Sequence, residues 1–150
     1  MPPIVTSAEI DRPAEEVFAY ATDPARFSEW QKGVVDGHMD GPGDGTGAPT
    51  VGAKCVTTRR IGGASRPSTS ELTHIDPPKT WGVRGIDGPI RAAVEVLVEP
   101  VTGSRSRLTI GVDFTGHGIG KVLVPLMVRR EARKEMPANM ASLKQIMEAG

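Results

Sequence analysis

The chain has 150 residues, of which 38% are hydrophobic and 24% charged, and its formal net charge is zero. A chain of this length can bury roughly 70% of its unfolded surface, which is enough for one core, and it is too apolar for general disorder. The balanced charge removes the usual electrostatic reason to expect nucleic acid or an anionic membrane as the main partner.

From the sequence we expect no secretory leader and no membrane span. Its first residues lack the basic start and apolar run of a signal peptide. The most apolar segment, residues 119–128, is far shorter than the ~20 residues that a bilayer requires. The single cysteine, Cys55, excludes an internal disulfide framework and any multi-cysteine metal site. We therefore expect one cytoplasmic domain over residues 1–150.

The first elements are a strand and two short helices. Residues 4–10 begin with β-branched side chains and alternate loosely, which is typical of a strand. Asp11 can cap the next element, so residues 14–21 are expected to form a helix. Asp23 and the proline after it repeat this start signal, and they indicate a second short helix that ends near Trp30.

Six further strands are expected, with a glycine-rich loop after the first of them. The last two alternate apolar and polar residues strictly, as in an antiparallel sheet with one covered and one solvated face. The loop, residues 40–52, has few side chains able to hold it, so we expect it to be the most mobile segment and a gate beside a cavity. The expected strands are 34–40, 53–61, 69–75, 80–86, 90–98 and 108–114.

From Ile119 onward, apolar residues recur every three or four positions, which predicts one helix of about 30 residues. Pro125 and Pro137 lie inside it. Because proline lacks the N–H and clashes with the carbonyl four residues back, we expect kinks, or a break at Pro137. The stripe is Val122, Pro125, Val128, Ala132, Met136, Met140, Leu143 and Met147. A solvated basic face is expected to carry Arg129, Arg130 and Arg133.

The order of elements predicts an α+β fold, a curved antiparallel sheet of about seven strands with one long C-terminal helix. A helix covers a strip ~10 Å wide, whereas such a sheet spans more than ~25 Å at ~4.8 Å per strand. One helix cannot fill that concavity. We therefore predict an internal cavity between the sheet and the C-terminal helix.

Several segments also carry a resemblance to a known family: RPAEEVFAYATDPARFSEW at 12–30, IDPPKTWGVRG at 75–85, and GIGKVLVPLMVRR at 118–130 running into ASLKQIME. They are similar to START-like proteins of the SRPBCC superfamily, which includes polyketide cyclase/dehydrase and lipid-transport proteins. The resemblance implies a helix-grip fold and a cavity for a hydrophobic or amphipathic small molecule. It implies no universal catalytic residue, and it leaves a homodimer open.

The strand at 69–75 holds the candidate polar anchor of such a cavity. Successive side chains of a strand point to opposite faces, so either Glu71 or His74 is expected to face inward, unless a bulge or strand end turns it to solvent. A lone ionisable group there would be a candidate acid, base or ligand anchor. The ligand-binding candidates are Trp30, Glu71, Thr73, His74, Trp81, Arg84, Val94, Leu108 and Ile110.

Other chemistry has weak support. The glycine-rich segment 115–121 fails the phosphate-loop and dinucleotide spacings, although its turn is an alternative anchor for an anionic head group. The histidines lack metal-ligand spacing, and Cys55 is interpreted as a small buried hydrophobic residue. We expect no cofactor, no metal and no nucleic acid. The histidines are His38, His74 and His117.

The function predicted is the binding of a lipid, fatty acid, polyketide or isoprenoid. Two alternatives stay open. One is a polyketide cyclase, aromatase or dehydratase in which Glu71 or His74, helped by Thr73 or Arg84, transfers protons. The other is an interaction protein with a vestigial cavity. Polar groups converging inside the cavity would favour the enzyme, and a mainly apolar lining would favour a carrier.

Overall fold

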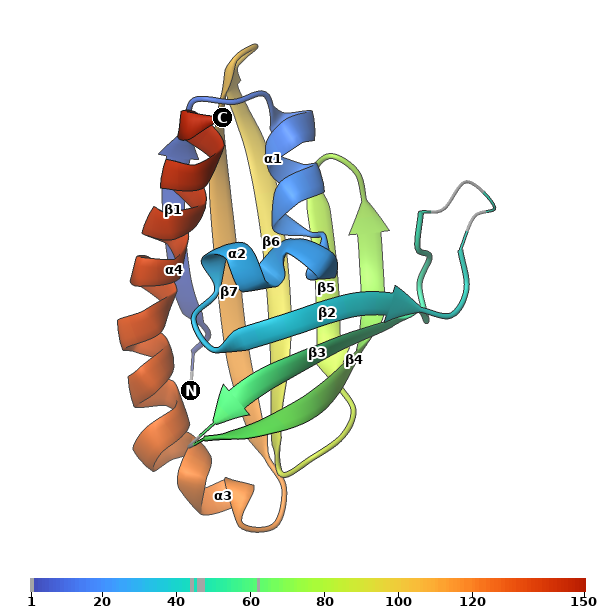
Figure 1. Ribbon diagram of the computed structural model, residues 1–150, viewed down its shortest axis with the longest axis vertical. Helices are drawn as coiled ribbons and strands as arrows, with labels where there is room; N and C mark the ends of the chain where they lie inside the picture. Colours follow the sequence, from blue (N-terminus) through green and yellow to red (C-terminus); the bar gives the residue numbers. More distant parts are fainter. Residues whose placement is uncertain (1, 44, 46–47, 62) are drawn as a thin grey trace.

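A computed structural model describes residues 2–43, 45, 48–61 and 63–150. In this part of the chain, seven strands form one antiparallel sheet in the order β1-β7-β6-β5-β4-β3-β2, which curves around the helices (Figure 1). The predicted α+β helix-grip architecture is confirmed. The strands are β1 (Ile4–Ile10), β2 (Val34–Asp40), β3 (Lys54–Ile61), β4 (Ala64–Asp76), β5 (Thr80–Gly85), β6 (Ile90–Thr102) and β7 (Arg105–Gly116).

The two predicted short helices follow β1 and lie over one face of the sheet, which we call the inner face (Figure 1). In α1 (Ala14–Ala21), the buried side chains include Val17 and Phe18, as its spacing predicts. The expected cap from Asp11 is wrong, because its carboxylate pairs with Arg105 at 3.5 Å. The second helix consists of a 3-10 turn η1 (Pro24–Arg26), capped by Asp23, and α2 (Phe27–Trp30).

The C-terminal segment is not one continuous α-helix. It consists of α3 (Gly120–Leu123), a π-helical turn η2 (Val124–Val128) and α4 (Arg129–Ala149). Pro125 lies in the π turn. The break expected at Pro137 is wrong, since α4 continues through it. Pro137 is exposed, so the carbonyl that loses its helical partner can be hydrated.

The π turn changes which residues of this segment are buried. Its five-residue spacing buries both Val124 and Arg129, at 6% and 2% exposure, while Val122 is 58% exposed. Val122 therefore does not belong to the core stripe, and Arg129 does not belong to the predicted solvated face. Further along α4, Met140 and Leu143 are buried against the sheet, as predicted.

A β-bulge interrupts β4. Leu72 pairs with Val83 and His74 pairs with Gly82, so Thr73 is the extra residue between them. Leu72 and Ile75 therefore share the inner face although three positions separate them. Strict alternation, on which the prediction of an inward Glu71 or His74 depends, does not hold in this strand.

The glycine-rich loop lies partly outside the described residues, because 44, 46 and 47 are not among them. The expectation that it is a mobile gate therefore stays a prediction. In its described part, Gly43 and Pro49 form an isolated antiparallel bridge. Within the described residues, none of the helices combines the length and apolar character that crossing a bilayer requires.

Candidate functional site

The inner face of the sheet is divided between an apolar and a polar part. On β6 and β7 it carries buried residues such as Val96, Val98 and Leu108. On β3, Cys55, Thr57 and Arg59 alternate onto the inner face. The residues opposite Cys55 and Thr57 on β4 are Ser70 and Ser68. The sheet therefore presents hydrocarbon along β6 and β7. On β3 and β4 it presents hydroxyl and guanidinium groups next to the apolar Cys55 and Leu72.

Arg59 is the charged group of this polar part. It is half-buried, and its Nη2 donates a hydrogen bond to Gln31 Oε1 at 3.3 Å. Burial lowers the pKa of the Arg59 guanidinium from its ordinary value, and the nearby Glu135 carboxylate of α4 partly opposes this shift. A cation that burial penalises in this way favours an additional anionic partner.

A cleft of about 430 Å³ opens between α2 and α4. Gln31 and Glu135, which both interact with Arg59, form part of its wall. Trp30 also lines it and is only 6% exposed, and its indole Nε1–H has no hydrogen-bond partner among the described residues. The remaining wall residues are Ser28, Glu29, Lys32, Glu131, Lys134, Ala138, Asn139 and Ser142.

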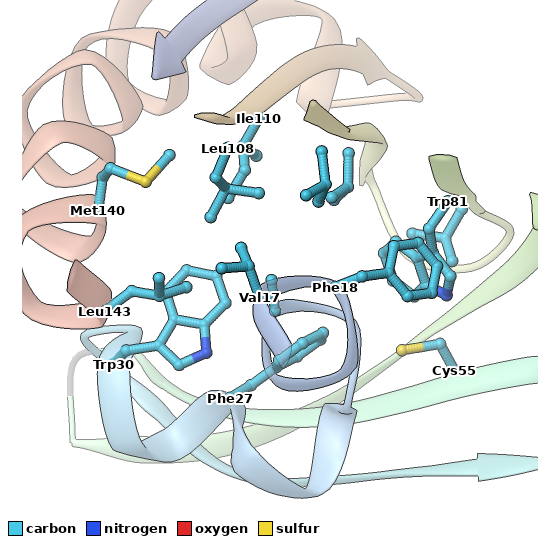
Figure 2. Packing of buried hydrophobic residues seen from close by; sticks show 14 of the residues in the cluster. Val17, Phe18, Phe27, Trp30, Cys55, Trp81, Leu108, Ile110, Met140 and Leu143 are labelled. Atoms are coloured by element: carbon cyan, nitrogen blue, oxygen red, sulfur yellow. The ribbon is translucent and has the colours of Figure 1, made fainter. Parts of the chain in front are cut away.

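Aromatic side chains connect this cleft to the interior (Figure 2). The Phe27 ring meets Trp30 edge to face at 5.8 Å between centroids, and it meets Trp81 in the same way at 6.3 Å. Leu143 of α4 lies beside Trp30 in this cluster (Figure 2). The space in which the sequence predicts an open cavity thus holds packed rings in the described part of the chain.

The candidates predicted on the strand at 69–75 face away from the helices. Glu71 lies on the outer face and pairs with Lys54 at 3.6 Å. His74, displaced by the bulge at Thr73, hydrogen-bonds to Glu95 of β6. Neither side chain points inward, so the structure shows the alternative that the sequence left open, a bulge that turns His74 to the outer face. Arg84, which pairs with Glu71 in the register, is also exposed on the outer face.

A glycine makes the His74–Glu95 contact possible. Gly82 lies between them on β5, and a Cβ at this position would be 2.9 Å from Glu95 Oε2 and still closer to the imidazole. The two side chains reach each other across the space that Gly82 leaves. This histidine–carboxylate pair is half exposed to exposed, so it lies on the surface of the sheet and not in a pocket.

The apolar candidates are on the inner face, as predicted. Trp81 is 2% exposed and Leu108 is fully buried. Val94 and Ile110 share the inner face with them, and Val94 is half-buried. Their orientation agrees with the predicted side of the sheet, and their contact with a ligand stays a prediction.

Cys55 is buried, as predicted, at 4% exposure. Burial raises the pKa of its thiol to about 11, with a small opposing effect of Arg59. At neutral pH the thiol is protonated and packs as a small apolar group. No group of three or more metal-binding side chains occurs in the part of the chain that the structure describes.

A second hollow, of about 380 Å³, lies between the end of β7 and the π turn. Arg129 forms part of its wall, and its Nη1 donates to Asp113 Oδ1 at 3.2 Å while Nη2 donates to the Pro2 carbonyl. At the turn that precedes α3, a Cβ on Gly116 would lie 2.1 Å from the Gly120 carbonyl oxygen. Only glycine fits there, so this turn is accounted for by close packing.

The sequence interpretation missed Arg59, Gln31 and Glu135. A signal for Arg59 was present, because a buried Cys55 places residues 57 and 59 on the same face by alternation. Nothing in the sequence could join Gln31 and Glu135 to Arg59. Gln31 directly follows α2 and Glu135 lies in α4, so the three residues are far apart along the chain.

Comparison with known proteins agrees with this architecture. The family model described as "Polyketide cyclase / dehydrase and lipid transport" matches residues 1–148. The chain belongs to this family. No curated protein matches this family member.

Solved structures of the same fold include two that cover nearly the whole of this family member. A START superfamily protein from Mycobacterium smegmatis is 13% identical, with a TM-score of 0.79 over 99% of each chain. The Zhui aromatase/cyclase from Streptomyces sp. R1128 is also 13% identical, with a TM-score of 0.79 over 97% of this chain and 93% of that one.

A longer protein is similar as well. The di-domain ARO/CYC BexL from the BE-7585A biosynthetic pathway is 16% identical, with a TM-score of 0.72. The family member aligns over 97% of its own length but spans only 46% of that chain. At these identities the likeness shows the fold, which the family match also supports, and not the ligand.

Proposed function

We propose that this protein binds an elongated amphipathic small molecule between the inner face of the sheet and α4. The anionic or strongly polar end lies at Arg59. The hydrocarbon part enters the apolar cluster against β6 and β7, which requires the packed rings of Phe27, Trp30 and Trp81 to move apart on binding. The division of the inner face into a polar and an apolar part carries this proposal, because it matches both ends of such a molecule. The family description and the likeness to aromatase/cyclase structures support the same ligand class.

The energetics favour Arg59 as the anchor. An apolar surface gives affinity without orientation, and a buried head group must be hydrogen-bonded or it loses roughly 1–3 kcal/mol. Among the inner-face residues discussed above, Arg59 carries the positive charge, and burial already lowers its pKa. The carboxylate or phenolate of a ligand would offset the desolvation cost of the guanidinium by pairing with its charge. Gln31 and Glu135, which interact with Arg59, line the cleft beside Trp30, so we infer that the head group approaches the guanidinium from this cleft.

The test compares Arg59→Gln with Arg60→Gln. Arg60 is the next residue, is exposed and points to the other face, so it controls for the loss of one charge from β3. We expect Arg59→Gln to weaken binding of a fluorescent fatty acid by at least about tenfold, the value of one charged hydrogen bond. Arg60→Gln should bind like the unsubstituted protein.

The methyl ester of the same fatty acid separates the anchor from the apolar surface. It lacks the carboxylate charge, so it should bind weakly and equally to all three proteins. Equal binding of the acid to Arg59→Gln and Arg60→Gln would show that the head group is held elsewhere. Native mass spectrometry of the purified protein would then identify any small molecule that co-purifies.

A cyclase, aromatase or dehydratase activity is the second candidate, and one observation favours it. Arg59, Gln31 and Glu135 converge at one place, and an acid–base reaction needs more than one polar group there. Glu71 and His74 do not support this activity from inside the fold, because both face outward. Conversion of a polyketide-like substrate that Glu135→Gln abolishes, while fatty-acid binding is retained, would establish it.

A further inference from the structure

Three large apolar side chains are exposed together at one end of the molecule. Ile119, Val122 and Met127 are 69%, 58% and 60% exposed. We call them the apolar tip. They belong to α3 and the turns on either side of it, which project at one end of the long axis (Figure 1). Such side chains are usually covered in a monomer when they cluster.

The π turn explains why these side chains are exposed together. Val122 and Met127 are five residues apart, which is the spacing that a π turn brings to one side. Val124 and Arg129 have the same spacing and are both buried on the opposite side. The π turn therefore turns one pair to the core and the other pair to solvent. An α-helical turn at this place would not align either pair.

The apolar tip has a basic border. Between residues 117 and 134, the single acidic residue is Glu131. The whole chain is neutral, so residues 117–134 have a positive excess that the overall charge conceals. The exposed cations of the segment are Lys121, Arg130, Arg133 and Lys134.

We propose that the apolar tip docks on the surface of an anionic lipid bilayer. Ile119, Val122 and Met127 enter the boundary between head groups and acyl chains, and the basic border contacts lipid phosphates. Apolar side chains with adjacent lysine and arginine are the combination that binds this interface. The projecting position of α3 lets the tip enter before the sheet meets the membrane.

The same charges disfavour a second copy of the chain as the occupant. In a two-fold dimer the same surface of both copies meets. Burying two apolar tips against each other would bring two sets of cations, including Lys121 and Arg130, into apposition. An anionic membrane neutralises those charges instead.

Co-sedimentation with vesicles tests the proposal on the unliganded protein, so it does not depend on the ligand proposed above. We expect binding to vesicles of equimolar phosphatidylcholine and phosphatidylglycerol, weaker binding to pure phosphatidylcholine, and a decrease as salt screens the charges. Val122→Glu and Met127→Glu should each weaken binding by about tenfold, as the loss of one inserted apolar side chain implies.

Matched controls are available on the same chain. Val5 is 61% exposed on the outer face of β1, so Val5→Glu makes the same chemical change at the same exposure away from the tip. Lys79 is exposed in the β4–β5 turn, at the opposite end of the molecule (Figure 1). Lys121→Glu should weaken binding to the anionic vesicles, while Lys79→Glu and Val5→Glu should not.

Three results would overturn the proposal. The unsubstituted protein could remain in the supernatant with both kinds of vesicle. Val5→Glu could weaken binding as much as Val122→Glu. Light scattering could show a lipid-free dimer that Val122→Glu dissociates, which would make a second copy the occupant.

Discussion

The pairing of a buried Arg129 with a half-exposed Asp113 leads to a specific prediction. Replacing the buried arginine should destabilise the fold less than neutralising its exposed partner. The side chain of Arg129 is 3% exposed, while that of Asp113 is 48% exposed, with 3.2 Å between Nη1 and Oδ1. Arg129 Nε has no hydrogen-bond partner among the described residues. The desolvation cost therefore falls almost entirely on Arg129.

Asp113→Asn leaves a buried guanidinium without its counter-charge. Breaking a buried ion pair from one side typically costs ~3–5 kcal/mol, and the solvent around Asp113 reduces this to about 1–3 kcal/mol here. Arg129→Met keeps an apolar side chain of similar length, and it leaves behind only Asp113 and the Pro2 carbonyl. Both are exposed enough to be hydrated, so we expect Arg129→Met to cost less than about 1 kcal/mol or to stabilise the fold.

Urea unfolding at neutral pH gives the two free energies, and the double variant completes a thermodynamic cycle. Arg130→Met, at the exposed neighbouring position, measures the general effect of replacing an arginine with methionine at the start of α4. If Arg129→Met loses as much stability as Asp113→Asn, or more, the buried guanidinium is a net stabilising group and the reasoning fails.

Two further predictions concern Cys55 and the bulge in β4. The pKa of the Cys55 thiol is raised from 9.0 to about 11, so the folded state favours the protonated thiol. Its contribution to the free energy of unfolding is therefore complete below pH 9. It is lost as the pH rises through 11, which lowers the free energy of unfolding by about 2–3 kcal/mol. Urea unfolding between pH 9 and 11 should show a smaller loss of unfolding free energy in Cys55→Ala than in the unsubstituted protein. Parallel pH profiles of the two proteins would contradict this prediction. Deleting Thr73 should cost less than about 2 kcal/mol in thermal unfolding, because Leu72 and Ile75 keep the inner face. Glu95 lies in a part of β6 that pairs regularly with β5 and β7, so deleting it should reverse the faces of neighbouring valines at ~1.5–3 kcal/mol each. Equal losses for both deletions would refute this account of the bulge.

Much of the fold could be predicted because apolar periodicity determines it. The strict alternation in 90–98 and 108–114 predicts β6 and β7, although both strands extend further than the apolar residues do. The helix signals around Asp23 likewise identify η1 and α2. These patterns are local, so a single sequence contains them.

Two irregularities changed the position of polar residues. The sequence left a bulge open and indicated a kink at Pro125, but it could not place either one or say which side chains would turn inward. The bulge at Thr73 moves His74 to the outer face, and the π turn buries Arg129. Thr73 is a residue that a regular strand tolerates, whereas Pro125 in the π turn does signal an irregular helix but does not specify which residues become buried. The choice depends on packing between distant segments, such as the contact of Arg129 with Asp113. Position in the register, and not residue identity, determined which polar groups face inward.

For the ligand that we propose, the division of the inner face implies selection for length. Arg59 lies on β3, and the apolar residues lie on β6 and β7, which are three and four strands away in the sheet order. At ~4.8 Å per strand this separation is roughly 14–19 Å. A molecule that occupies both parts at once must extend across the strands, at a right angle to them. The sheet would then distinguish ligands by length, in steps of one strand width. Compact ring systems would reach only one part of the inner face, and extended chains would reach both parts.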